Sequence, residues 1–90
     1  DLRGCYYDAD FFAVQADSGE VITLTVETTE GAGNRDIYIY GPAEDELAHE
    51  YGSENPQTAE ATAVESGTHY VVVRYSINNI TYEMTVGVTD

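Results

Sequence analysis

The sequence predicts an all-β protein: an antiparallel β-sandwich of the jelly-roll type, with about seven to eight strands and no substantial helix. Two observations carry this prediction. Segments in which apolar and polar residues alternate recur along the chain, separated by short turns rich in Gly, Asp, Asn and Ser. One segment, residues 66–75, is instead apolar on both faces, which is typical of a strand in the middle of a sandwich.

The first two strands are expected on either side of a turn at residues 17–20. Gly19 supplies a positive φ there and Asp17 can bond its own backbone, so the turn favours a hairpin. The following strand, residues 21–28, alternates like a half-buried antiparallel strand. The predicted inward positions are Phe12, Val14, Ala16, Ile22, Leu24 and Val26.

A loop rich in small residues, 29–34, precedes a strand at residues 36–40, which Pro42 prevents from continuing as an interior strand. Residues 43–50 are predicted to form a loop that brings Leu47 to the core, in preference to a single helical turn. A short edge strand is expected at residues 48–53.

Residues 54–56 read as a turn, and residues 57–64 alternate Ala with Thr or Glu. The Thr residues and nearby turns favour a strand over a helix there. The central strand 66–75 follows. A hairpin connection is expected at residues 77–79, leading to a final alternating strand from Ile80 to Val88.

Charge is the strongest compositional signal. The chain has 17 acidic residues, three Arg and no Lys, giving a formal net charge of −14. Such a surface excludes nucleic acid as a partner and disfavours anionic membranes. It resembles the surfaces of proteins from extreme halophiles and indicates a protein adapted to salt, calcium or both. An acidic surface kept only for solubility is the alternative.

No apolar run approaches the roughly 20 residues needed to span a bilayer, so no membrane insertion is expected. Residues 1–90 are interpreted as one domain. The start at Asp1, without an initiator Met, indicates either a mature processed product or a domain cut from a longer protein.

Five blocks of the chain resemble, in order, those of the bacterial and archaeal pre-peptidase C-terminal (PPC) domain. They are Asp8-Ala9-Asp10-Phe11-Phe12-Ala13-Val14, residues 18–26, Asp36-Ile37-Tyr38-Ile39-Tyr40, residues 66–73 and Tyr82-Glu83-Met84-Thr85-Val86. The resemblance implies a secreted, non-catalytic jelly-roll module, usually appended to peptidases or other exported enzymes. This chain departs from the usual pattern at His69, where an aromatic residue is common, and at Cys5. An enzyme domain, which usually accompanies the family's module, is not expected within these 90 residues.

Catalysis is not expected. His49 and His69 are the only imidazoles, and His69 is predicted to be a packed strand residue. No Ser has a nucleophile-elbow context, and Cys5 has no cationic neighbour in sequence to lower its pKa.

Calcium is the predicted cofactor. Asp8 and Asp10 place two carboxylates at the start of a strand, and Asp36 at the head of another strand is a candidate third ligand. The PPC-like collagen-binding domains of collagenases hold calcium with acidic residues at about this position, as the resemblance implies. The alternative is that Asp8 and Asp10 merely cap a turn.

Three further features are candidate sites. Asn79-Ile80-Thr81 is an N-glycosylation pattern at a predicted loop. Unpaired Cys5 is a candidate for contact between molecules, or else a small buried hydrophobe. Tyr38, Tyr40 and Tyr70 are predicted to share one face, as a binding surface for polysaccharide, protein or a second copy, or simply as the rim of the core.

Together these features predict an extracellular or cell-surface β-sandwich with a structural or adhesive role. Calcium is expected to stabilise it and to drive self-association into a homo-oligomer or filament. The alternative is an accessory substrate-binding domain of a larger secreted peptidase.

Overall fold

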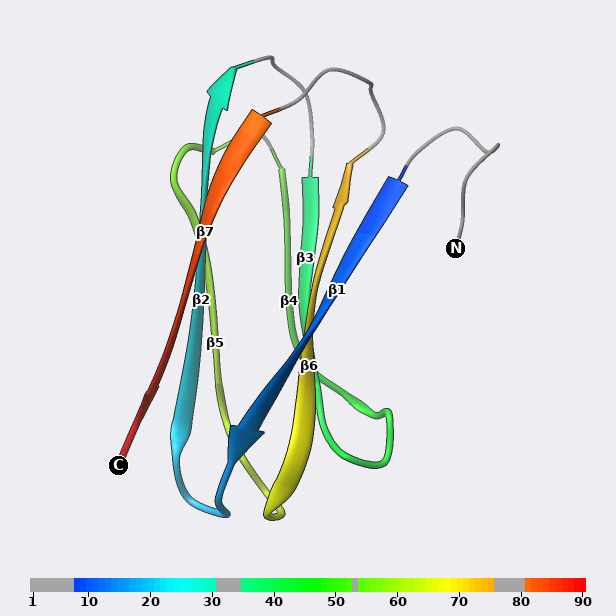
Figure 1. Cartoon of the computed structure of the whole chain (residues 1–90), viewed down its shortest axis with the longest axis vertical. Helices are drawn as coiled ribbons and strands as arrows, with labels where there is room; N and C mark the ends of the chain where they lie inside the picture. The colour runs from blue at the N-terminus through cyan, green and yellow to red at the C-terminus, as the bar shows by residue number, and fades with distance from the viewer. Residues whose placement is uncertain (1–7, 31–34, 53, 76–80) are drawn as a thin grey trace.

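The computed structural model describes residues 8–30, 35–52, 54–75 and 81–90, and all regular structure in these ranges is β-strand. The sheets are antiparallel throughout, in the orders β1-β6-β3-β4 and β5-β2-β7, and they lie face to face (Figure 1). This confirms the predicted sandwich. The strands are β1 (Asp8–Ala16), β2 (Val21–Glu30), β3 (Arg35–Tyr40), β4 (Glu46–Gly52), β5 (Gln57–Thr62), β6 (Gly67–Tyr75) and β7 (Thr81–Thr89). The described residues include no helix long and apolar enough to span a membrane.

Strand β6 lies inside the four-stranded sheet, between β1 and β3, as its composition predicts. Val71 and Val73 point into the core and are fully buried. Val72 points to the opposite face, yet it is only 2% exposed. The outer face of β6 is therefore covered at Val72, whereas Tyr70 on the same outer face is 37% exposed.

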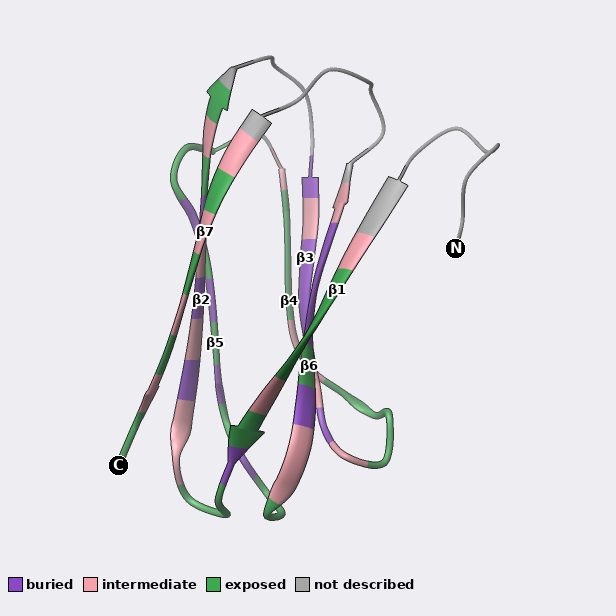
Figure 2. Cartoon of the chain, in the orientation of Figure 1, coloured by how far each residue is buried: buried purple, intermediate pink, exposed green. Residues whose placement is uncertain are grey.

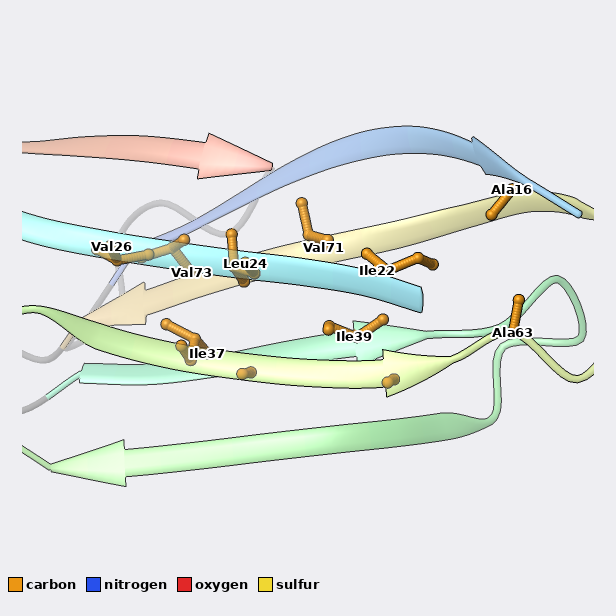
Figure 3. Close-up of a cluster of buried hydrophobic side chains, with 11 residues drawn as sticks. Ala16, Ile22, Leu24, Val26, Ile37, Ile39, Ala63, Val71 and Val73 are labelled. Atoms are coloured by element: carbon orange, nitrogen blue, oxygen red, sulfur yellow. The ribbon is translucent and has the colours of Figure 1, made fainter. Parts of the chain in front are cut away.

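The core fills the space between the two sheets (Figure 3). Ile22, Leu24 and Val26 of β2 meet Ile37 and Ile39 of β3, and all five are fully buried. Each such side chain contributes about 1.5–3 kcal/mol relative to an exposed one. The alternation predicted for β2 is confirmed. Burial also alternates along β5, with Ala59 and Ala61 facing inward, which confirms a strand rather than a helix.

The two predicted hairpins at residues 17–20 and 77–79 are wrong, because β1 and β2, and likewise β6 and β7, belong to different sheets. The turn after β1 crosses from one sheet to the other, beside the turn that links β5 to β6. The two crossings bond to each other: Gly19 N donates to Ala63 O at 2.8 Å, and Ala63 N donates to Glu20 O at 2.7 Å. These bonds replace those that would close a hairpin.

A tight turn, rather than a long loop, joins β3 to β4. Gly41 N donates to Asp45 O at 2.8 Å, and Glu44 N donates to Gly41 O at 2.9 Å. The chain reverses its direction within this turn, so β4 begins at Glu46, before the predicted start of the edge strand at Ala48. Leu47 packs against the core as expected, but from a strand.

Phe12 is less buried than the alternation predicts. Its register partner is core residue Val71, so it faces the second sheet, but 39% of it remains exposed. β1 is an edge strand of the four-stranded sheet, and the middle of this strand is exposed (Figure 2). Phe11, on the outer face, is 59% exposed.

Buried Arg35 ties the two sheets together. The side chain is 2% exposed, and its Nε donates to Gln57 Oε1 of the other sheet at 3.2 Å. Its two terminal nitrogens donate to Thr28 Oγ1 and to the carbonyl oxygen of Glu54. Burial lowers the pKa of Arg35 below its ordinary value. The guanidinium still stays charged near neutral pH, because arginine does not deprotonate there.

Candidate functional site

The outer face of the four-stranded sheet carries a continuous group of aromatic side chains. Because Ile37, Ile39 and Val71 point into the core, the residues that alternate with them point away from it. Across the strands, Tyr40 is the register partner of Tyr70. The outer-face residues Phe11, Val72, Tyr38 and His49 form the next row from β1 to β4. We call this surface, from Phe11 to His49, the aromatic face.

Tyr38 lies at the centre of a stack of rings. Its ring centroid is 5.6 Å from that of Tyr40, with 17° between the planes, and 4.4 Å from that of His49, with 12° between the planes. Offset stacking of this kind adds about 0.5–1.5 kcal/mol per pair beyond the area buried. Tyr38 is only 8% exposed, so it forms the floor of the aromatic face.

Charged groups fix this stack at its far edge. Arg74 Nη1 donates to Tyr38 Oη at 3.3 Å, with the guanidinium carbon 5.9 Å from the ring centroid. His49 Nε2 lies 3.2 Å from Asp36 Oδ1. Burial raises the pKa of Tyr38 above its ordinary value of 10.0, the negative charge of Asp36 raises it further, and the positive charge of Arg74 opposes both.

At the other edge the aromatic face is hollowed. Phe11, Tyr40, Tyr70 and Glu44 line a groove of about 380 Å³. We call this hollow the aromatic groove. Its size falls at the low end of ligand-binding pockets, and its chemistry is that of such sites, mostly apolar with few polar groups. Phe11 is 59% exposed and Tyr70 37%, so two of its rings are accessible to a ligand.

The fourth lining residue comes from the β3–β4 turn. Glu44 has a φ of 67°, in the left-handed region that Gly or Asn normally occupies. For any other residue this conformation costs about 1 kcal/mol. The tight turn holds Glu44 there, which makes it a lining residue of the aromatic groove.

The structure places Tyr38, Tyr40 and Tyr70 on the same outer face of the sheet, and their role as a binding surface stays a prediction. Sequence reasoning missed Phe11, Glu44, His49 and Arg74. Alternation already put Phe11 on the opposite face from Phe12. What it could not supply was the register that sets β1 beside β6, with Ala13 directly opposite Tyr70.

Two of the three predicted calcium ligands, Asp10 and Asp36, lie apart in the structure. Asp10 of β1 is the register partner of core residue Val73 and accepts a hydrogen bond from Tyr82 Oη, so it faces inward. Asp36 is the partner of Arg74 and bonds His49 on the outer face. The two carboxylates therefore lie on opposite faces of the sheet. The side chain of Asp8 lies outside the described residues, among which no group of three metal-ligating side chains occurs.

Two other predicted sites, Cys5 and Asn79, also lie outside the described residues. His69 is fully buried, which confirms that it is a packed strand residue. Its Nδ1 lies 3.0 Å from Gly67 O. His49 is held between the ring of Tyr38 and the carboxylate of Asp36. Neither imidazole lines the aromatic groove.

A comparison with curated proteins finds no match to the chain. The family model of the bacterial pre-peptidase C-terminal domain matches residues 8–74, from β1 to the end of β6. Strand β7 lies beyond the matched residues but completes the three-stranded sheet through its pairing with β2. The match covers well over half of the chain, in which five blocks resemble the same family. The chain belongs to the bacterial pre-peptidase C-terminal domain family, a family of non-catalytic domains found in secreted proteins.

Proposed function

We propose that this PPC domain is a non-catalytic adhesive module of an exported protein, which holds an extracellular protein or polysaccharide on its aromatic face. The observation that carries the proposal is the aromatic groove, where the exposed rings of Phe11 and Tyr70 stand beside the partly buried ring of Tyr40. Exposed aromatic rings grouped over a rigid sheet are typical of binding surfaces, because they give large contact areas at low entropic cost.

The neighbouring stack supports the same role. Stacking and charged partners fix Tyr38 and His49 before any ligand arrives, so little side-chain entropy is lost on binding. The proposed role of the domain is attachment, either as part of a larger exported enzyme or on its own.

A depletion assay tests this proposal. The purified domain is incubated with insoluble chitin, cellulose, fibrillar collagen and casein-coated beads, and the protein left in solution is measured. We expect at least one polymer to remove the domain, and the double variant Phe11→Ala, Tyr70→Ala to remain in solution. The matched control is Val64→Ala, which removes an apolar side chain that is 73% exposed and does not line the groove. Binding to none of these polymers, or equal binding by the double variant, contradicts the proposal.

Self-association is a second candidate role, favoured by the edge strand β1. Phe11 and Phe12 stand on opposite faces of this strand and both are well exposed. An edge with unpaired backbone groups and apolar side chains is a template for pairing with another copy. In this second proposal, calcium bound by Asp8 and Asp10 offsets the repulsion between acidic copies.

Sedimentation with and without about 5 mM calcium tests this second role at the millimolar affinities usual for extracellular modules. We expect calcium to produce a larger species and to raise the unfolding temperature. Asp8→Asn with Asp10→Asn is expected to abolish both effects, whereas the matched change Glu60→Gln leaves them intact. A monomer at every calcium concentration contradicts the proposal.

A further inference from the structure

The aromatic groove combines ring faces with one carboxylate. Phe11, Tyr40 and Tyr70 supply the rings and Glu44 supplies the negative charge. The face of an aromatic ring carries partial negative charge, so a cation near it is attracted. The negative charge of Glu44, a lining residue, adds to that attraction. The groove therefore suits a ligand that is flat or apolar along its length and positively charged.

The net charge of the whole chain also favours a positively charged ligand. With a net charge of −14, the domain repels carboxylates and concentrates cations near its surface. Two of its three Arg are already placed in the structure: Arg35 is buried between the sheets, and Arg74 lies against Tyr38. The third, Arg3, lies outside the described residues. Because two copies that each carry a net charge of −14 repel each other, we expect the cation to come from a different protein rather than from a second copy of this chain.

The same surface already shows the contact that such a cation would make. Arg74 lies over the ring of Tyr38 and donates to its hydroxyl group, within the aromatic face. A guanidinium is flat and weakly hydrated, so it stacks on rings and can fork onto a carboxylate, which a compact ammonium group does less well. Tyr40 and Glu44 are both lining residues of the groove, so a ring and a carboxylate belong to the same site.

We propose that the aromatic groove binds an arginine side chain of a partner polypeptide, with the guanidinium stacked against the groove's rings and paired with Glu44. The inference rests on the adhesive function proposed above, because it names the partner class and the anchor residue for that surface. The left-handed φ of Glu44 fits this role. A glutamate is unfavourable in this backbone conformation, but it supplies the carboxylate that the proposed site needs.

Titration with two capped pentapeptides tests the proposal, at the lowest salt concentration that keeps the domain folded. One peptide carries Arg between Gly pairs, and the other carries citrulline, the uncharged isostere of Arg. Binding is followed by backbone amide chemical shifts. We expect the Arg peptide to bind about tenfold more tightly than the citrulline peptide. The largest shifts are expected at Phe11, Tyr40, Glu44 and Tyr70.

Variants of Glu44 distinguish the effect of losing the carboxylate from an effect on folding. Glu44→Gln keeps the size of the side chain and is expected to weaken Arg binding about tenfold. Glu60→Gln makes the same charge change on the opposite sheet and is expected to alter binding less than about twofold. Glu44→Gly removes the carboxylate but relaxes the backbone, so it is expected to lose affinity while its unfolding temperature stays the same or rises.

Equal binding of the Arg and citrulline peptides overturns the inference, as does full affinity in Glu44→Gln. Preferential binding of chitosan, a cationic polysaccharide, over the Arg peptide also overturns it. If the Arg peptide fails while polymers still bind through Phe11 and Tyr70, the adhesive function stands and only the arginine anchor is wrong. If no polymer binds but the Arg peptide binds as described, the adhesive proposal fails and the arginine site stands.

Discussion

At the residue scale, Arg35 brings a positive charge between the sheets, and the hydrogen-bond acceptors that the described residues offer its side chain are all uncharged. Neutral oxygens of Thr28, Gln57 and the Glu54 backbone surround its guanidinium. Asn55 closes the same region, since its side chain both accepts from Thr28 N and donates to Thr28 O. The Arg35 side chain therefore holds β3 to the opposite sheet and to the turn before β5.

Replacing Arg35 with Met should cost about 2–4 kcal/mol of unfolding free energy. The apolar stem is kept, but Gln57 Oε1 and Thr28 Oγ1 lose their donor in a buried place. Urea unfolding measures the loss. Arg35→Lys should recover only part of it, because an ammonium group does not reproduce the fork of three nitrogens. A loss below about 0.5 kcal/mol in Arg35→Met would show that the hydrogen bonds of the Arg35 side chain contribute little to stability.

Tyr38 should make the stability of the domain fall in alkaline solution. Burial, helped by the charge of Asp36, raises the pKa of Tyr38 above the value of 10.0 expected in the unfolded chain. The contribution of protonated Tyr38 to the free energy of unfolding is complete below about pH 10. It is lost as the pH rises through the pKa of Tyr38 in the folded protein, because Tyr38 loses its proton at a lower pH in the unfolded chain. Urea unfolding at about pH 9 and about pH 11 should show a smaller fall for Tyr38→Phe than for the parent domain. An equal fall in both would contradict this.

At the scale of the elements, alternation located the strands, because each has one face against the core. It predicted the starts of β2 and β5 correctly but placed the end of each strand two residues away, and it placed both ends of β7 within one residue. It could not predict which strands pair. The turn at residues 17–20 has the composition of a hairpin, yet it crosses between sheets because its backbone bonds to Ala63 and the Ser66 side chain. The aromatic groove depends on that pairing, so only its β3 and β6 tyrosines were predictable.

Gly67, at the start of β6, should tolerate no side chain. Its φ of 146° is rarely adopted by other residues, and an added Cβ would lie 3.2 Å from Cγ of Pro42. Gly67→Ala should therefore lower the unfolding free energy by more than about 1 kcal/mol. Gly87→Ala is the matched control, since a Cβ there meets nothing within 4 Å. It should be neutral or slightly stabilising, and equal effects of the two substitutions in urea unfolding would contradict the prediction.

At the scale of the whole molecule, the net charge of −14 sets the response to salt. Repulsion among surface carboxylates is screened as the Debye length falls from about 10 Å at 0.1 M to about 3 Å at 1 M. The unfolding temperature should therefore rise with sodium chloride or potassium chloride alike. A variant with Gln at exposed Glu27, Glu50, Glu60, Glu65 and Glu83 should respond less, as scanning calorimetry would show. An identical salt response in this variant would contradict screening as the cause.

The pairing of β1 with β6 and of β2 with β7 also determines how the protein can fold. Apart from the β3–β4 hairpin, the ladders join segments distant in sequence, which is the condition of high contact order and of folding in about milliseconds to seconds. Strand β1, made first, finds no partner until β6 exists. Until then the aromatic rings of Phe11 and Phe12 stand beside an unpaired backbone, so the residues best placed to hold a partner are also those most prone to aggregate in a half-folded chain.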